Sequence, residues 1–182
     1  LALLMVFALA VPLEALLLES WEGTGVLGIG DSQGPWTRMK EAPKDLTVAF
    51  SPLHASDGDF SLAIRTPGGW VQALSNTVNF TDAVPHLSLR QAIASRGMLS
   101  VDVFTDESLG EARVTLLMLG SKMLYTSLQG ETFRCGDAHV LRFMIDNKVA
   151  ANLKNDDDWF QFIFVLQSSG AGTIYLDNLR IE

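Results

Sequence analysis

The chain contains 182 residues, 48% of them hydrophobic, and it carries a formal net charge of −8. This length is sufficient for one domain with a hydrophobic core, and the apolar content argues against intrinsic disorder. The acidic balance, without any basic stripe, argues against a nucleic-acid partner and is compatible with a neutral ligand or a bound cation. Because Cys135 is the single cysteine, the chain cannot form an internal disulfide bond.

Residues 1–15 differ in composition from the rest of the chain. They read LALLMVFALAVPLEA, which is almost wholly apolar and has no charge before Glu14. The segment is too short for a stable membrane span, and its composition is typical of the apolar region of a secretory signal peptide. We therefore expect a signal-peptide remnant at 1–15 and one secreted, extracellular or periplasmic domain at 16–182. A buried helix or strand is the alternative interpretation of 1–15.

Short segments with alternating apolar and polar residues, separated by Gly-, Pro- and Asp-rich turns, make up most of residues 16–182. The pattern predicts an all-β protein, an antiparallel β-sandwich (jelly roll) of about nine strands. In one of these segments, Phe60, Leu62 and Ile64 are expected to face the core, because they alternate with Ser61, Ala63 and Arg65. The segment 147–158 is polar, and the chain shows little convincing helix. The expected strands include residues 45–51, 60–65, 98–104, 112–119, 139–145 and 159–166.

The last eleven residues, GTIYLDNLRIE, are expected to form the final strand. Strict alternation places Leu176 and Leu179 on opposite faces, so either both faces are covered or a bulge near Asp177 and Asn178 shifts the register. A carboxylate this deep in an apolar strand needs partners, because an unsatisfied buried charge is costly. A bound cation or amide donors from a loop would satisfy it. The plainer alternative is that Asp177 and Asn178 cap a turn.

Four motifs follow one another along the chain in a recognisable order: Trp21-Glu22-Gly23, then DGDFSL at 57–62, LSVDVF at 99–104 and IYLDNLR at 174–180. In this order the chain resembles the jelly-roll carbohydrate-binding modules of the galactose-binding-like superfamily, and the resemblance covers nearly all of residues 16–182. Trp21 stands where those modules commonly have Phe. The segment 80–97 has no clear counterpart in them.

The resemblance implies a structural calcium ion where the first and last strands meet. Its expected ligands in this sequence are Glu22, Asp57, Asp59 and Asp177. Calcium prefers six to eight hard oxygen ligands, and carboxylates and loop carbonyls supply that chemistry. An Asp that caps a turn without any ion is the alternative.

The resemblance also implies sugar binding on the concave sheet or at the loop rim. A pyranose ring is recognised by flat aromatic faces together with polar side chains for its hydroxyl groups. Any one of the aromatic residues could instead belong to the core, as most aromatic residues of a β-sandwich do. The predicted ligand-binding residues are Trp36, Trp70, Tyr125, Arg65, Gln72 and Arg142.

Residues suited to catalysis form no recognisable pattern. His54, His86 and His139 are far apart and lack metal-ligand spacing, and Cys135 has no partner histidine indicated. The sequence therefore predicts non-catalytic binding of a polysaccharide or oligosaccharide by an exported module with a structural calcium, with a carbohydrate-active enzyme as a possible partner. The alternatives are a jelly-roll polysaccharide lyase or glycoside hydrolase, and a protein-interaction domain of the same superfamily.

Overall fold

The structure is a computed structural model that describes residues 16–22, 37–38, 43–74, 78–79, 97–120, 126–128, 130–152 and 159–182. The expected signal-peptide remnant at 1–15 lies outside the described residues, as do Trp36 and Tyr125. In the part of the chain that is described, no helix is long and apolar enough to cross a membrane.

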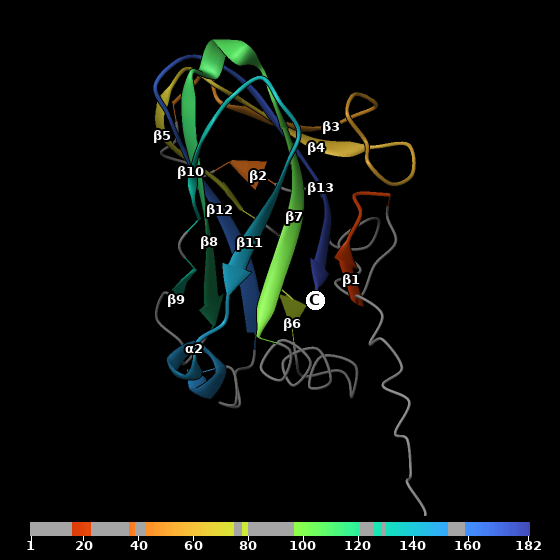
Figure 1. Cartoon of the computed structure of the whole chain (residues 1–182), viewed down its shortest axis with the longest axis vertical. Helices are drawn as coiled ribbons and strands as arrows, with labels where there is room; N and C mark the ends of the chain where they lie inside the picture. The colour runs from red at the N-terminus through yellow and green to blue at the C-terminus, as the bar shows by residue number, and fades with distance from the viewer. Residues whose placement is uncertain are drawn as a thin grey trace, which may run out of the picture.

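Two antiparallel sheets pack face to face as a β-sandwich, which confirms the predicted jelly-roll fold class (Figure 1). Sheet A has the order β11 (His139–Met144), β7 (Met98–Thr105), β13 (Gly172–Ile181), β4 (Ser61–Thr66) and β3 (Thr47–Ser51), and β1 (Leu16–Glu19) also pairs with β13. Sheet B has the order β10 (Thr132–Arg134), β8 (Glu111–Gly120), β12 (Trp159–Ser168), β5 (Gly69–Leu74) and β2 (Thr37–Arg38), while β6 (Val78–Asn79) pairs with β12 and β9 (Thr126–Leu128) with β8.

The core lies between the two sheets and is built from alternate residues of their strands. In sheet A, Val101 and Val103 are fully buried, and in sheet B Phe162 and Phe164 are almost fully buried. Each such side chain contributes about 1.5–3 kcal/mol through removal from water. The residues between them lie on the two outer faces of the sandwich, and parts of these faces are covered as well, since Ile163 is only 2% exposed.

The final strand β13 contains the bulge that the sequence suggested. Its pairing with β7 shifts register between Asp177 and Arg180, and Asn178 has φ 54°. Asn is one of the few residues that enter the left-handed region at low energy. Because the bulge adds one residue, Leu176 and Leu179 both reach the core, and the side chain of Asp177 lies on the outer side of sheet A.

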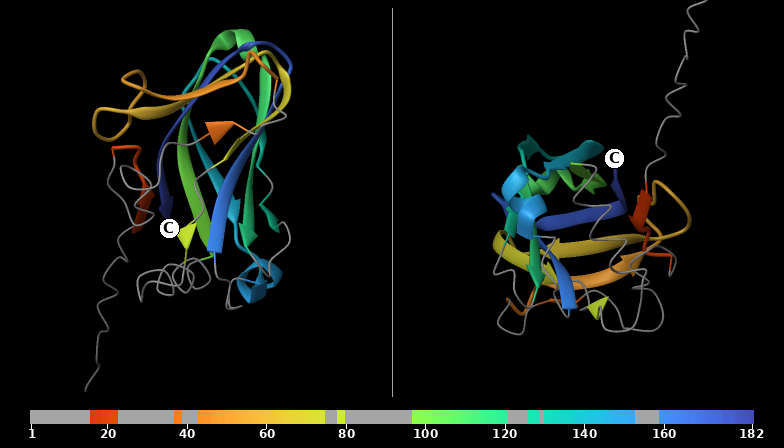
Figure 2. Two further views of the ribbon diagram at one scale, coloured as in Figure 1. Left: turned by 180° about the vertical axis from the view of Figure 1, so that it is seen from behind. Right: turned by 90° about the horizontal axis from the view of Figure 1, so that it is seen from below.

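The two ends of the sandwich are marked by short helices. The 3-10 helix η1 (Glu107–Leu109) lies at the upper end in Figure 1, close to the β4–β5 and β12–β13 turns, and α2 (Asn147–Asn152) lies at the lower end. Figure 2 shows from behind that β1 and the hairpin formed by β3 and β4 lie together at one side of the sandwich.

Two local predictions were wrong. Residues 147–152 form helix α2 where no helix was expected, because Asp146 accepts a hydrogen bond from the Val149 amide at 2.8 Å and the side chain of Val149 is buried. Phe60 is 41% exposed instead of facing the core, since it precedes β4 and its amide is held by Glu22.

Candidate functional site

Loop 52–60, which joins β3 to β4, is held against the first and last strands by two carboxylates. Asp177 Oδ2 accepts hydrogen bonds from the Ser56 amide at 2.5 Å and the Asp57 amide at 2.9 Å, and Asp177 Oδ1 accepts one from the Asn178 amide at 2.7 Å. Glu22 Oε1 accepts hydrogen bonds from the amides of Asp59, at 2.8 Å, and Phe60. We call this arrangement the loop seam.

The loop seam brings together the four residues predicted to bind calcium, but it uses them differently. Glu22 and Asp177 direct carboxylate oxygens at backbone N–H groups, whereas Asp57 and Asp59 contribute those N–H groups and leave their side chains exposed. Calcium requires oxygen ligands in place of N–H donors. Among the described residues, no group of three or more His, Cys, Asp or Glu side chains is placed to hold a metal ion.

The buried carboxylate of Asp177 is satisfied by loop amides in this arrangement. Of the two means that could satisfy Asp177, a cation or loop amides, the structure contains the amides. Asp177 is 0% exposed, and its burial raises the pKa of this carboxyl group, while the hydrogen bonds from Asp57, Ser56 and Asn178 act in the opposite direction. Calcium therefore remains a prediction, without support from the contacts at the seam.

A second polar network surrounds Asp102, which lies opposite Asp177 on β7. Asp102 Oδ2 accepts hydrogen bonds from Ser56 Oγ at 2.7 Å and Asn178 Nδ2 at 3.2 Å, and Asp102 Oδ1 forms an ion pair with Arg180 at 2.8 Å. Both oxygens of Asp102 are thus occupied, and its partner carboxylate is fully buried. The pair is therefore structural, and it does not resemble two carboxylates that face each other across an open cleft.

Loop 52–60 also covers the aromatic residues on the outer face of sheet A. The His54 ring lies 5.2 Å from the Phe104 ring in a stacked arrangement and 4.7 Å from the Tyr175 ring. Tyr175 is only 9% exposed. The flat faces that could stack on a sugar are therefore occupied by the protein's own loop.

The outer face of sheet B carries an open aromatic residue in a polar row. Thr132 pairs with Arg113, Arg113 with Gln167, and Gln167 with Trp70, across the four neighbouring strands β10, β8, β12 and β5. Residues directly opposite each other in antiparallel strands face the same side of the sheet. We call these four residues the Trp70 row. It spans about 14 Å, since neighbouring strands lie about 4.8 Å apart.

The Trp70 row combines a flat apolar surface with hydrogen-bonding groups. Trp70 is 58% exposed, and Gln167 is also exposed. A cleft of about 270 Å³ lies beside it and is lined in part by Arg113, Thr132 and Gln167. Arg113 is held in place because its Nε donates a hydrogen bond to the Gly130 carbonyl at 3.1 Å. This surface can stack on a ring and hydrogen-bond to hydroxyl groups.

The six predicted sugar-binding residues do not form one surface. Trp70 and Gln72 lie on β5 of sheet B, whereas Arg65 on β4 and Arg142 on β11 belong to sheet A. Arg65 lines a cleft at the upper end of the sandwich, and Arg142 forms an ion pair with Glu182 at 3.5 Å. The side chain of Gln72, like Trp36 and Tyr125, lies outside the described part.

Sequence reasoning missed Gln167 and Thr132 as members of the row. The signal for Gln167 was present, because it continues the alternation of β12 one step beyond the expected end of the strand at residue 166. Thr132 lies in the strand β10, whose three residues are too few for alternation to identify a strand. Arg113 is two strands away from Trp70, and no local pattern in the sequence places it in the same row.

Comparison with solved structures identifies the fold. The chain superimposes on the family 11 carbohydrate-binding module from Clostridium thermocellum, solved in complex with a β-1,3-1,4-mixed-linked tetrasaccharide, with a TM-score of 0.54 and 11% identity over 92% of this chain and 94% of that one. The fold is that of carbohydrate-binding modules. The xylan-binding module CBM15 gives a TM-score of 0.53 at 13% identity, covering 82% of this chain and 91% of that one.

A third carbohydrate-binding module has the same fold. The C-terminal family 22 module of Clostridium thermocellum Xyn10B gives a TM-score of 0.52 at 15% identity and covers 82% of this chain and 87% of that one. At these identities the likeness shows the shared jelly-roll fold. No family model matches the sequence, and no curated protein matches it.

Proposed function

We propose that this protein is a non-catalytic carbohydrate-binding module that binds a polysaccharide along the Trp70 row. The observation that carries the proposal is Trp70 itself, a large aromatic side chain that is 58% exposed beside Gln167 in a row of polar residues. An exposed Trp flanked by hydrogen-bonding groups suits the apolar face and the equatorial hydroxyl groups of a sugar ring. The shared fold with modules described as binding xylan or a mixed-linked tetrasaccharide supports the same class of ligand.

The arrangement of charge also favours a neutral glycan. The chain has a formal net charge of −8, so an anionic polymer would be repelled at long range. The row holds one cation, Arg113, whose Nε is already engaged by Gly130. Neutral hydroxyl groups can hydrogen-bond to the polar side chains of the row without any charge matching. We therefore propose a neutral β-linked polysaccharide as the ligand.

The proposal has three further parts: export, association with a carbohydrate-active enzyme, and a structural calcium ion. The composition of residues 1–15 supports export of the module. Export and binding of a polysaccharide together support an association with a carbohydrate-active enzyme, whose substrate the module would hold nearby. A structural calcium at the loop seam is the least supported part, because the carboxylates there contact amides.

Isothermal titration of the full chain with xylohexaose, cellohexaose and a mixed-linked β-glucan oligosaccharide tests the function. Trp70→Ala should weaken binding at this row about 30-fold, since truncation of an anchoring Trp costs about 2 kcal/mol. The matched control is Met144→Ala, because Met144 is 68% exposed but lies on β11 of the other sheet. Product release from any of these sugars would instead support a lyase or hydrolase. Equal affinity of Trp70→Ala and wild type would show that the Trp70 row does not bind the sugar.

A further inference from the structure

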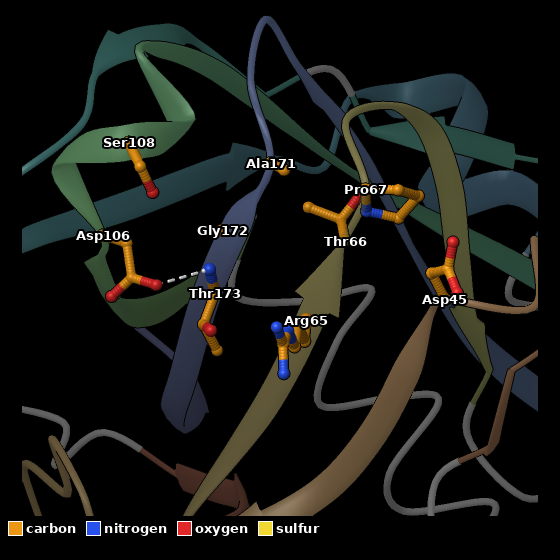
Figure 3. A pocket seen from close by; sticks show the side chains of 9 residues that line it. All are labelled: Asp45, Arg65, Thr66, Pro67, Asp106, Ser108, Ala171, Gly172 and Thr173. Atoms are coloured by element: carbon orange, nitrogen blue, oxygen red, sulfur yellow. Dashed lines mark hydrogen bonds between the residues drawn. The ribbon is translucent and has the colours of Figure 1, made fainter.

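A second cleft lies at the upper end of the sandwich, on the side of sheet A. It has a volume of about 510 Å³, within the range of about 300–1,000 Å³ that is usual for small-molecule sites. Figure 3 shows that its walls come from three segments: the end of β4 with Arg65 and Thr66, the start of β13 with Thr173, and the segment after β7 with Asp106 and, in η1, Ser108. Asp45 lies at the far side of the cleft, before β3.

Reciprocal hydrogen bonds fix two of these walls to each other. The Thr173 amide donates to Asp106 Oδ2 at 2.7 Å, and the Asp106 amide donates to the Thr173 carbonyl at 2.9 Å. The adjoining turn is held as well, because the Gly170 amide donates to the Leu109 carbonyl at 3.0 Å. A site formed in advance loses little entropy on binding. The cleft therefore has a defined shape before any ligand enters.

Arg65 supplies a hydrogen-bond donor that the protein does not use internally. Its side chain is exposed, points into the cleft in Figure 3, and has no hydrogen bond or ion pair among the described residues. Asp45 likewise has no partner there, and Asp106 uses only Oδ2. The hydroxyl groups of Ser108 and Thr173 complete the lining. The cleft thus offers donors and acceptors side by side, and no aromatic side chain lines it.

The charges and hydrogen-bonding groups of this lining indicate the chemical class of the ligand. The lining carries one guanidinium and two carboxylates, so its formal charge is −1, which opposes a phosphate or a uronate. A metal cation would be repelled by the Arg65 guanidinium, which lines the same cleft as the two carboxylates. A neutral polyol can bind both the carboxylates and the guanidinium, because each hydroxyl group can donate a hydrogen bond to a carboxylate and accept one from the guanidinium.

We propose that this cleft is a second sugar-binding site, which takes one or two neutral sugar residues through their hydroxyl groups. The proposal rests on the function proposed above and adds a site to it. Thr66 and Gly69, at the two ends of the β4–β5 turn, belong to sheets A and B, so the cleft and the Trp70 row lie at the same end of the molecule on opposite faces. Two sites on opposite faces allow one molecule to hold two glycan chains, which raises its avidity for a polysaccharide.

The test compares stoichiometry in single and double variants of the full chain, titrated with xylohexaose and cellohexaose. Wild type should bind two oligosaccharides per chain, Arg65→Ala one, Trp70→Ala one, and the double variant none. Lys148→Ala is the matched control, because Lys148 is an exposed cation on α2 at the opposite end, and it should keep two. In Trp70→Ala, the amide resonance of Thr173 should still shift on addition of sugar.

Each other outcome overturns a defined part of the proposal. If Arg65→Ala keeps the wild-type stoichiometry while Trp70→Ala loses all binding, the second site is absent and the Trp70 row stands. If each of the two single variants loses all binding, Arg65 and Trp70 serve one site and the second site is again excluded. If wild type binds neither oligosaccharide, the proposed function fails together with the inference. Arg65 is exposed, so its truncation should leave the urea unfolding midpoint unchanged.

Discussion

The part of sheet A that loop 52–60 covers and the outer face of sheet B use similar residues in opposite ways. On sheet A, loop 52–60 places His54 over Phe104 and Tyr175, and every oxygen of Asp102 and Asp177 has a partner. On sheet B, Trp70 stands open beside a polar row and a cleft. Aromatic and charged residues are present on both faces. The two faces differ in whether these side chains are accessible to a ligand.

This difference separates a structural region from a binding region. Polar groups that are buried and satisfied hold the fold together, because removing one partner leaves the other desolvated and unpaired. Exposed aromatic residues make no comparable contribution to stability, and they retain their surface for a ligand. We therefore expect substitutions at the loop seam to change the free energy of unfolding, and substitutions in the Trp70 row to change affinity.

The largest expected effect is that of Asp177→Ala. Removal of this carboxylate leaves the amides of Ser56, Asp57 and Asn178 without their acceptor, so the free energy of unfolding should fall by about 3–5 kcal/mol. Urea unfolding followed by tryptophan fluorescence measures it. The matched control is Asp57→Ala, which removes an exposed carboxylate from the same loop, keeps its amide, and should change stability by no more than about 0.5 kcal/mol. Equal losses in both variants would contradict the amide contacts described here.

A smaller effect is expected from Gly58→Ala, also in loop 52–60. Gly58 has φ +73°, and an added Cβ would lie 2.6 Å from Glu22 Cδ. Glu22 cannot move aside without breaking its hydrogen bonds to the amides of Asp59 and Phe60. We expect a loss of about 2 kcal/mol, of which about 1 kcal/mol is backbone strain.

Gly69→Ala measures the cost of backbone strain without any contact to Glu22. Gly69 has φ +79° but no atom within 4 Å of an added Cβ, so only the strain of about 1 kcal/mol should appear. The difference in unfolding midpoint between the two variants therefore measures the contact with Glu22. If Gly69→Ala lost as much stability as Gly58→Ala, the position of Glu22 at the seam would be wrong.

The sequence predicted the elements of the fold well, because most strands carry a local signal. Alternation located the strands, and the mismatch between Leu176 and Leu179 indicated the bulge at Asp177 that the structure contains. The sequence also indicated that Asp177 needs either a cation or loop amides as its partner. The answer depended on where loop 52–60 lies, and no local pattern encodes the approach of two segments more than a hundred residues apart.

The candidate site was predictable only in part, for a related reason. Alternation shows that a residue faces away from the core, but a sandwich has two outer faces, so Arg65 and Trp70 were grouped although they lie on different sheets. The exposure of Trp70 followed from its place after the Gly68–Gly69 turn, whereas its neighbours Arg113 and Gln167 are set by strand order. Strand order is determined by the packing of the whole domain.

The smallest expected effect concerns calcium, and it tests what holds the seam. If amides satisfy Asp177 and Glu22, then EDTA should leave the melting temperature of the full chain unchanged within about 1 °C. A bound calcium at 100 times its Kd would add about 2.7 kcal/mol, which corresponds to about 5–10 °C for a chain of this size. Differential scanning fluorimetry with EDTA, with calcium and with magnesium as a control separates the two cases. A drop of several degrees in EDTA, restored by calcium but not by magnesium, would show that the ion replaces the amides as the partner of these carboxylates.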